Sequence, residues 1–356
     1  MARVIGAHMV GSVPLPDTAA VLRQCTTAQP NRLKRIPDGE TGLRNLFTVW
    51  QSQLFQVSPD LCTKFEYNRP VASGDFTADQ IDAGIQKLKD AGPLETGYDK
   101  AAIESYATFK KLKAEGVVPA ATRFQVSIAT PPNTLTPFVQ HPFQAKVEPI
   151  YQEALYRNMR TLQESIAHEE LAIQIDLAVD TAFWENYMFV PWFGDGDPDK
   201  VKEYIVDYTV RMIGQVEPDV EVGLHNCYGD MEHRHWLEPK SLAVIAERAL
   251  RIYAQTPHPI NFFHCPVPTS ALDNLDAYLA PLKELIPKFE EHKTDLYLGV
   301  IHYDDRPATE KMIEAAKRVL GDYPFGVGTE CGMGRTPAEQ VEGILKLTAA
   351  VSEPAF

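Results

Sequence analysis

Positive charge is scarce in this chain of 356 residues, in which 34 lysines and arginines stand against 48 aspartates and glutamates, a net charge of −14. Nucleic acids and anionic membrane surfaces are bound through clustered basic side chains. The acidic balance argues against both kinds of partner, and we expect neither a nucleic acid nor a membrane to be bound.

Long hydrophobic runs are also missing. No segment approaches the run of about 18 consecutive apolar residues that indicates a membrane-spanning helix. The N-terminal sequence, in which His8 interrupts a short apolar stretch, lacks the charged start and long apolar core of a secretory signal. We therefore expect a cytoplasmic protein.

Cysteine is sparse as well, with five residues spread along the chain. A disulfide framework would favour an even number at clustered spacings in a short chain. The pattern instead predicts reduced thiols, any special one of which acts as a metal ligand or a nucleophile.

What is present is an alternation of short apolar runs with helical patterns, which is typical of parallel βαβ units. Eight such runs end abruptly at polar, Gly or Pro residues: Arg3–Met9, Arg32–Pro37, Arg123–Ala129, Leu171–Ile175, Val220–Leu224, Ile260–Phe263, Asp295–Ile301 and Pro324–Val327. The main helical patterns cover Ala78–Ala91, Lys100–Glu115, Pro142–Glu169, Pro198–Gln215, Ser241–Gln255, Ser270–His292, Thr309–Leu320 and Thr336–Val351.

This alternation predicts an α/β protein with a single (β/α)8 barrel, a TIM barrel, over residues 1–356, with a helical insertion after the second strand over residues 52–120. An open doubly wound sheet would show the same alternation. However, no G-x-G-x-x-G follows the first run and no G-x-x-x-x-G-K-[ST] occurs, which counts against a nucleotide-binding open sheet.

Chemically active side chains gather where the predicted strands end. The active site of a (β/α)8 barrel lies at the C-terminal ends of its strands. These ends carry Ser12, Glu40, Asp176, His225, Cys227, His264, Cys265, Asp304, Glu330 and Cys331. The sequence therefore predicts a site at the mouth of the barrel.

The sharpest element is the spacing of His225 and Cys227, since residues two apart on a strand point the same way. Zinc binds imidazole nitrogen and thiolate sulfur, and catalytic sites keep one position open. Cys331 offers a second thiolate, and the sixth strand offers His264 or Cys265. Because a shift of one residue turns a side chain to the other face, the sequence leaves that last choice open. We expect Zn²⁺ to be bound here.

The order of the strand-end motifs resembles the catalytic domain of cobalamin-independent methionine synthase, within the uroporphyrinogen decarboxylase/methionine synthase-like superfamily of barrels. The segments that carry the resemblance are Val10-Gly11-Ser12, Asp38-Gly39-Glu40, Gln174-Ile175-Asp176, His225-Asn226-Cys227, Leu298-Gly299-Val300 and Cys331-Gly332-Met333. Each motif is short, but their order extends over nearly the whole chain.

This resemblance implies a transferase in which a thiol substrate is activated as a zinc thiolate and receives a methyl or alkyl group. It implies that Glu40 and Asp176 contact a cationic group of the thiol substrate and that Ser12 binds its carboxylate. The family's proton-donating histidine has no clean counterpart, so Asp304 or His302 is expected to handle the proton.

The departures from the family concern the folate side of the site. The family has a tryptophan after the third strand, whereas the segment 128–132 (Ile-Ala-Thr-Pro-Pro) offers no aromatic ring, and Leu177-Ala178-Val179 stands where the family has Glu-Pro-Ala. We therefore expect a small-molecule thiol and a methyl or alkyl donor other than methyltetrahydrofolate.

Two alternatives remain open at this point. A metal-free, uroporphyrinogen-decarboxylase-like lyase would hold its substrate with arginines such as Arg44 and Arg123. A non-catalytic or partner-dependent methyl-transfer subunit would dock a carrier protein, for which the aromatic stretch Phe183–Phe193 is a candidate, although a lid over the barrel mouth explains it more simply. Neighbouring histidines in Glu232–His235 are expected to be solvated or capping.

Overall fold

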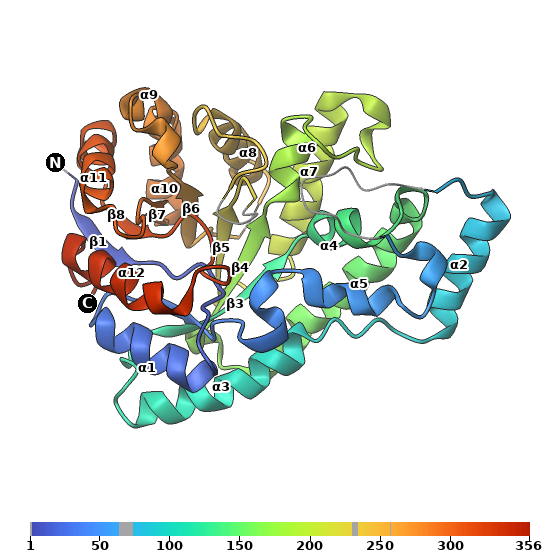
Figure 1. Ribbon diagram of the computed structural model, residues 1–356, viewed down its shortest axis with the longest axis horizontal. Helices are drawn as coiled ribbons and strands as arrows, with labels where there is room; N and C mark the ends of the chain where they lie inside the picture. The colour runs from blue at the N-terminus through green and yellow to red at the C-terminus, as the bar shows by residue number, and fades with distance from the viewer. Residues whose placement is uncertain (1, 64–73, 230–233, 257) are drawn as a thin grey trace.

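The structure is a computed structural model that describes residues 2–63, 74–229, 234–256 and 258–356 (Figure 1). Its strands are β1 (Val4–Ala7), β2 (Arg35–Pro37), β3 (Arg123–Ala129), β4 (Leu171–Leu177), β5 (Glu221–Asn226), β6 (Phe262–Pro266), β7 (Asp295–Gly299) and β8 (Phe325–Gly328). Its helices are α1 (Thr18–Ala28), α2 (Ala78–Asp90), α3 (Tyr98–Ala114), α4 (Pro131–Phe138), α5 (His141–Ser165), α6 (Val179–Trp184), α7 (Pro198–Ile213), α8 (Ala243–Tyr253), α9 (Leu275–Leu279), α10 (Leu282–His292), α11 (Arg306–Leu320) and α12 (Ala338–Val351).

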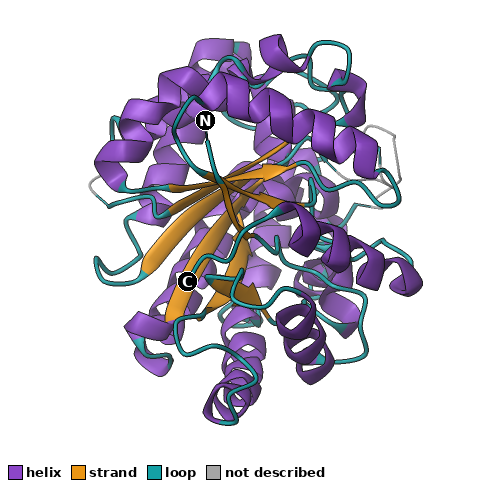
Figure 2. Cartoon of the chain, turned by 90° about the vertical axis from the view of Figure 1, so that its left-hand side faces the viewer, coloured by secondary structure: helices purple, strands orange, loops and turns teal. Residues whose placement is uncertain are grey.

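The eight strands form one parallel sheet in the order β1-β8-β7-β6-β5-β4-β3-β2. The sheet curls on itself, because Ala7 at the end of β1 bridges to Leu33 just before β2 and its N–H donates to the Arg32 carbonyl at 2.9 Å. Figure 2 shows the strands gathered at the centre with helices around them. The prediction of eight parallel strands in a barrel-like α/β fold is confirmed.

Most predicted helices are present, with shifts of a few residues at their ends. The single helix expected over Ser270–His292 is interrupted, because Pro281 caps α10 after α9 has ended at Leu279. Three further helices, α1, α4 and α6, were not predicted. No helix among the described residues combines the length and the apolar composition needed to cross a membrane.

The segment between β2 and β3 contains three short 3-10 helices, η1 (Gly42–Leu46), η2 (Val49–Phe55) and η3 (Pro59–Leu61), followed by α2 and α3. Helix α3 packs against α1, α5 and β3, which places it in the ring of helices around the sheet. Helix α2 lies outside that ring against α5, at the right edge of Figure 1. The insertion over residues 52–120 stays a prediction.

The interior of the barrel is polar and aromatic, whereas aliphatic side chains fill the space between sheet and helices. Arg35 on β2 is 4% exposed and donates to Glu221 at 2.6 Å and to Asp295 at 3.0 Å. Its guanidinium lies 4.4 Å from the centre of the Phe262 ring. These contacts tie β2 to β5 and β7 across the barrel.

Replacing Arg35 by methionine is expected to lower the free energy of unfolding by about 3 kcal/mol, because the carboxylates of Glu221 and Asp295 lose their buried partner. Urea denaturation measures the loss. The control is Arg306→Met, which removes an exposed ion pair with Glu310 and is expected to cost less than about 1 kcal/mol. Equal losses in the two variants would show that the Arg35 contacts do not hold the barrel together.

Candidate metal centre and adjoining cavities

The candidate site lies where three residues on neighbouring strands are in register with one another. Asp176 on β4 is in register with His225 on β5, and His225 is in register with His264 on β6. Residues in register on parallel strands share a face of the sheet, so these three side chains lie at one level on the same face. All three are buried, with 6%, 3% and 0% of their surfaces exposed.

Asn226, the last residue of β5, lies between His225 and Cys227 and faces the other way. Asn226 receives a hydrogen bond from the fully buried Arg248 at 2.9 Å and donates to the backbone carbonyl of His264 at 2.9 Å. Arg248 also donates to Thr181 of α6 at 3.0 Å. These bonds fix Asn226 toward the helices, so that His225 and Cys227 both face the barrel mouth.

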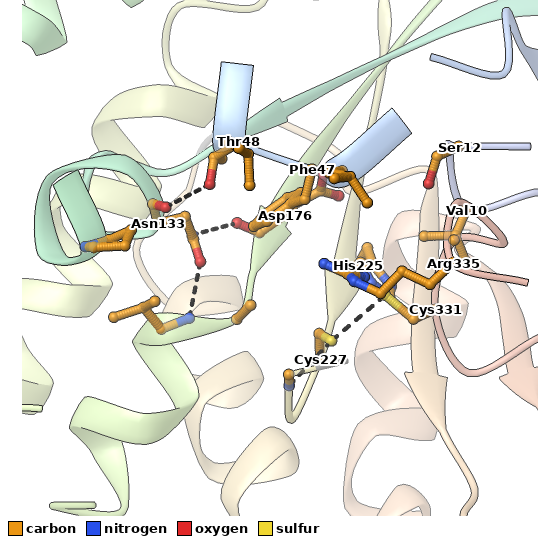
Figure 3. Close-up of a pocket in the computed structure, with 18 of the residues that line it drawn as sticks. Val10, Ser12, Phe47, Thr48, Asn133, Asp176, His225, Cys227, Cys331 and Arg335 are labelled. Carbon is orange, nitrogen blue, oxygen red and sulfur yellow. Dashed lines mark hydrogen bonds between the residues drawn. The ribbon is translucent and has the colours of Figure 1, made fainter. Parts of the chain in front are cut away.

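His225, Cys227 and Cys331 form a group whose candidate ligand atoms all lie within 4.8 Å of one another (Figure 3). The two sulfur atoms are 3.8 Å apart. Zinc–sulfur bonds of about 2.3 Å at a tetrahedral angle place two thiolates about 3.8 Å apart. The Gly229 N–H donates to the Cys227 sulfur at 3.2 Å, which holds this side chain beside Cys331. The donor set and its spacing fit a metal ion such as zinc.

Neither candidate from β6 joins this group. Both ring nitrogens of His264 are in use, with Nδ1 at 2.8 Å from His225 Nδ1 and Nε2 at 3.0 Å from the Thr329 carbonyl oxygen. Cys265 lies on the opposite face of the strand, fully buried among aliphatic residues between sheet and helices, where burial raises the pKa of its thiol. The structure brings together His225, Cys227 and Cys331, and the completion of the metal site by His264 or Cys265 stays a prediction.

A cavity of about 270 Å³ opens beside this group, and it also contains the three residues predicted to bind substrate. Ser12, Glu40 and Asp176 line it together with the candidate metal ligands. Aromatic rings cover much of the remaining wall: Phe47, Phe138, Phe189 and Trp236. Phe189 belongs to the aromatic stretch that was expected to cover the barrel mouth, whereas the other three rings come from separate segments that the sequence did not indicate.

Glu40 and Asp176 place two carboxyl groups in this cavity. Burial raises the pKa of Asp176 to about 8. Burial and the nearby Asp176 also raise the pKa of Glu40 well above its ordinary value. Gln174 holds one Asp176 oxygen by donating to it at 2.8 Å and donates to the Val10 carbonyl at 2.7 Å. A ligand that brings positive charge would therefore favour ionisation of both carboxyl groups.

The turn that carries Ser12 is packed against the end of β8. A Cβ atom on Gly332 would lie 2.5 Å from the Ser12 hydroxyl, and one on Gly11 would lie 3.0 Å from the Glu40 carboxylate. A side chain at Gly332 would therefore displace the Ser12 hydroxyl, and one at Gly11 would press on the Glu40 carboxylate. Gly11 and Gly332 thus allow Ser12, Glu40 and the turn that contains Cys331 to lie close together.

A second, polar cavity of about 390 Å³ lies on the other side of the cysteines, which line both cavities. Glu330 lies between two imidazoles there, 3.3 Å from His235 Nε2 and 3.8 Å from His302 Nδ1. Interactions with Glu330 and Glu238 raise the pKa of His235 to about 9 despite its burial. His235, expected to be solvated or capping, therefore belongs to the surroundings of the site, whereas Glu232 and His233 lie outside the described residues.

The two candidates for proton transfer are placed differently. His302 lines the polar cavity, where its Nδ1 lies 3.8 Å from the Glu330 carboxylate and its Nε2 lies 3.0 Å from the Val267 carbonyl oxygen. Asp304 is exposed and is not among the residues that line either cavity. The structure thus brings His302 toward the cysteines and does not bring Asp304 there.

The features that suggested other functions are largely accounted for by packing. Arg44 is paired with Asp38 at 2.6 Å, and Arg123 is paired with Glu221 at 3.2 Å, so both guanidinium groups have acidic partners. In the aromatic stretch, Phe183 is buried and Phe189 lines the first cavity against Trp236. This placement favours a cover over the barrel mouth.

Comparison with solved structures identifies the architecture. The chain is similar to a B12-independent methionine synthase from Shewanella sp. W3-18-1 in complex with selenomethionine, with a TM-score of 0.52 and 11% identity over 98% of this chain and 96% of that one. It is also similar to a putative vitamin-B12 independent methionine synthase from Listeria monocytogenes, with a TM-score of 0.50 and 13% identity over 99% and 97%. This is a methionine synthase-like fold.

The methionine synthase-like fold confirms the architecture that the ordered motifs implied. No known protein-family model matches the chain, and no curated protein is detectably similar to it. At 11% and 13% identity the likeness establishes the fold, and the roles of individual residues have to be argued from their own geometry.

Proposed function

We propose that this protein is a zinc-dependent methyl or alkyl transferase that acts on a thiol. The observation that carries the proposal is a shared cavity: the group His225, Cys227 and Cys331 lies in the wall of the same cavity as Glu40 and Asp176. A thiol compound with a cationic group can therefore bring its sulfur to the metal and its charge to the carboxylates at the same time.

His225, Cys227 and Cys331 would hold the metal, leaving a tetrahedral position for the substrate. When bound, zinc supplies positive charge that lowers the pKa of a substrate thiol from about 8.5 and so favours the nucleophilic thiolate near neutral pH. The N–H of Gly229 donates to the Cys227 sulfur and so helps to position this side chain toward the proposed metal.

The other end of the thiol substrate would be held by charge. Glu40 and Asp176 would bind an ammonium group, and the hydroxyl of Ser12 would donate to a carboxylate. Gln174 keeps one oxygen of Asp176 in place. An amino acid that carries a thiol fits this arrangement, and the similar Shewanella structure is itself a complex with selenomethionine.

The electrophile would be a methyl or alkyl donor other than methyltetrahydrofolate. The substrate sulfur forms a bond to the donor's alkyl carbon, and the leaving group departs with the electrons of the broken bond. His302 would give that group a proton, since it is the proton-transfer candidate that lines a cavity next to the cysteines. We propose that a small-molecule thiol and this donor are the partners of the site.

The test is metal content together with transfer. Protein purified without chelators is expected to carry one zinc per chain and to convert a thiol amino acid into its thioether with an activated methyl donor, detected by mass spectrometry. Freshly purified protein that contains no zinc would refute the proposal. Zinc-free protein that instead decarboxylates a porphyrinogen would support the lyase alternative.

A further inference from the structure

At the candidate metal centre, a ring nitrogen of His225 and a ring nitrogen of His264 lie within hydrogen-bond distance of each other. His225 Nδ1 and His264 Nδ1 are 2.8 Å apart, and both residues are buried, with 3% and 0% of their surfaces exposed. A hydrogen bond between two ring nitrogens requires that one of them carries a proton and that the other is bare. The hydrogen-bond partner of the second ring nitrogen of His264, Nε2, determines which of the two Nδ1 atoms carries the proton.

That partner is the backbone carbonyl oxygen of Thr329, 3.0 Å from His264 Nε2. A carbonyl can only accept, so His264 carries its proton on Nε2. A cationic His264 would be an unpaired charge in a site with no exposure, since no carboxylate bonds to it among the described residues. The neutral ring therefore has a bare Nδ1, which accepts a hydrogen bond from His225 Nδ1–H.

We propose that His264 is a positioning residue, which fixes the tautomer and orientation of His225 and leaves its Nε2 as the nitrogen that binds the metal together with Cys227 and Cys331. This inference rests on the proposed function. In this proposal the metal has three protein ligands, and His264 on β6 does not bind the metal but forms a hydrogen bond with the ligand His225. Hydrogen-bonded partners of this kind orient a ligating imidazole and increase its basicity.

The alternative is that His264 turns and binds the metal itself. That movement would break both of its hydrogen bonds inside a packed barrel interior, where the ring of His8 lies 5.3 Å from that of His264. It would also leave the Thr329 carbonyl without this donor. The hydrogen bond from Asn226 Nδ2 to the His264 carbonyl oxygen at 2.9 Å further holds the backbone of β6 beside β5.

Two substitutions separate the roles. In His264→Asn the amide oxygen stands near the position of Nδ1 and can still accept from His225, whereas His264→Leu can neither accept nor bind a metal. Zinc affinity is measured by competition with a chromophoric chelator. We expect His264→Leu to bind zinc about 10-fold to 100-fold more weakly, and His264→Asn to stay close to wild type.

X-ray absorption of the zinc-loaded protein measures the number of sulfur and imidazole ligands, which would not change if His264 only supported the fold. Wild type and His264→Asn are both expected to show two sulfur ligands and a single imidazole. Cys265→Ala, which changes the neighbouring residue on the other face of β6, is the matched control and should bind zinc as wild type does. Thermal unfolding checks that each variant is folded. If His264→Leu does not fold, the zinc affinity of His264→Asn and the absorption spectra still test whether His264 binds the metal.

Two imidazoles on zinc in the wild type, or a loss in His264→Asn as large as that in His264→Leu, would overturn the inference while leaving the proposed function standing. Wild-type protein that binds no zinc at all would overturn both.

Discussion

Protein carrying Cys331→Ser is expected to contain no stoichiometric zinc and to transfer no methyl or alkyl group to a thiol. The Cys331 sulfur lies 3.8 Å from that of Cys227, a separation that fits two thiolates on one tetrahedral ion. Because the loss of a residue behind a ligand already weakens metal binding about 10-fold to 100-fold, the loss of a ligand should exceed 100-fold. Elemental analysis of zinc per chain and the transfer assay measure the two effects.

Two other cysteines provide the control for that experiment. Cys265 and Cys25 are fully buried in apolar surroundings, and burial raises the pKa of both thiols. Their alanine variants are expected to keep one zinc per chain, although each loses some packing. If Cys331→Ser retained its zinc, or if Cys265→Ala lost it, the assignment of the metal site would be wrong.

Asp176→Asn is expected to reduce kcat/KM for a thiol that carries an amino group. A hydrogen bond to a charged group is worth about 1.5–3 kcal/mol, which corresponds to a loss of about 10-fold to 100-fold. A thiol that lacks the amino group should react with the variant and the wild type at similar rates. Glu40→Gln should show the same selectivity. Equal losses for both thiols would mean that the carboxylates do not recognise a cation.

The same substitution has a predictable effect on the empty protein. Burial raises the pKa of Asp176 from 3.8 to about 8, so between these values the folded state holds a proton that the unfolded state has lost. The free energy of unfolding therefore falls as the pH rises through this window, by at most about 1.4 kcal/mol per pH unit for one group. Below the window both states are protonated and this penalty vanishes.

Asp176→Asn should thus stabilise the metal-free and ligand-free protein more at pH 8 than at pH 5, as measured by urea denaturation at both values. A stability difference between variant and wild type that does not change with pH would show that Asp176 is already ionised in the folded state. If these carboxyl groups bind the ligand as proposed, the site is maintained at the expense of the stability of the empty fold.

The fold could be predicted because each strand is a short apolar run that ends at a polar residue. β3 is confirmed over Arg123–Ala129, and β7 begins at Asp295 as expected. Helix α4 could not be predicted in this way, since it is buried on all sides and begins with Pro131 and Pro132, so it shows no amphipathic pattern. The sequence pattern therefore predicted where strands end, but it did not predict helices that are buried on all sides.

The site was predictable only where it depends on local spacing. His225 on β5 and Cys227 directly after its end lie two residues apart, and this spacing in an extended segment places both side chains on one face. The choice between His264 and Cys265 depends on the register of β6 with β5, which pairing between strands decides. The approach of His235 to Glu330 and of Trp236 to Phe189 joins distant segments, and no local pattern contains that information.

The closure of β1 on β8 also sets an order of events during synthesis. Ala7 pairs with Val327, so β1 has no partner on that side until β8 has been made. Ser12 and Cys331 are brought together by the same pairing. A nascent chain therefore contains His225 and Cys227 before it contains Cys331, and the group that we propose as a metal site is complete only once β8 lies beside β1. Zinc that binds there as proposed would then bind to a barrel whose last strand is already in place.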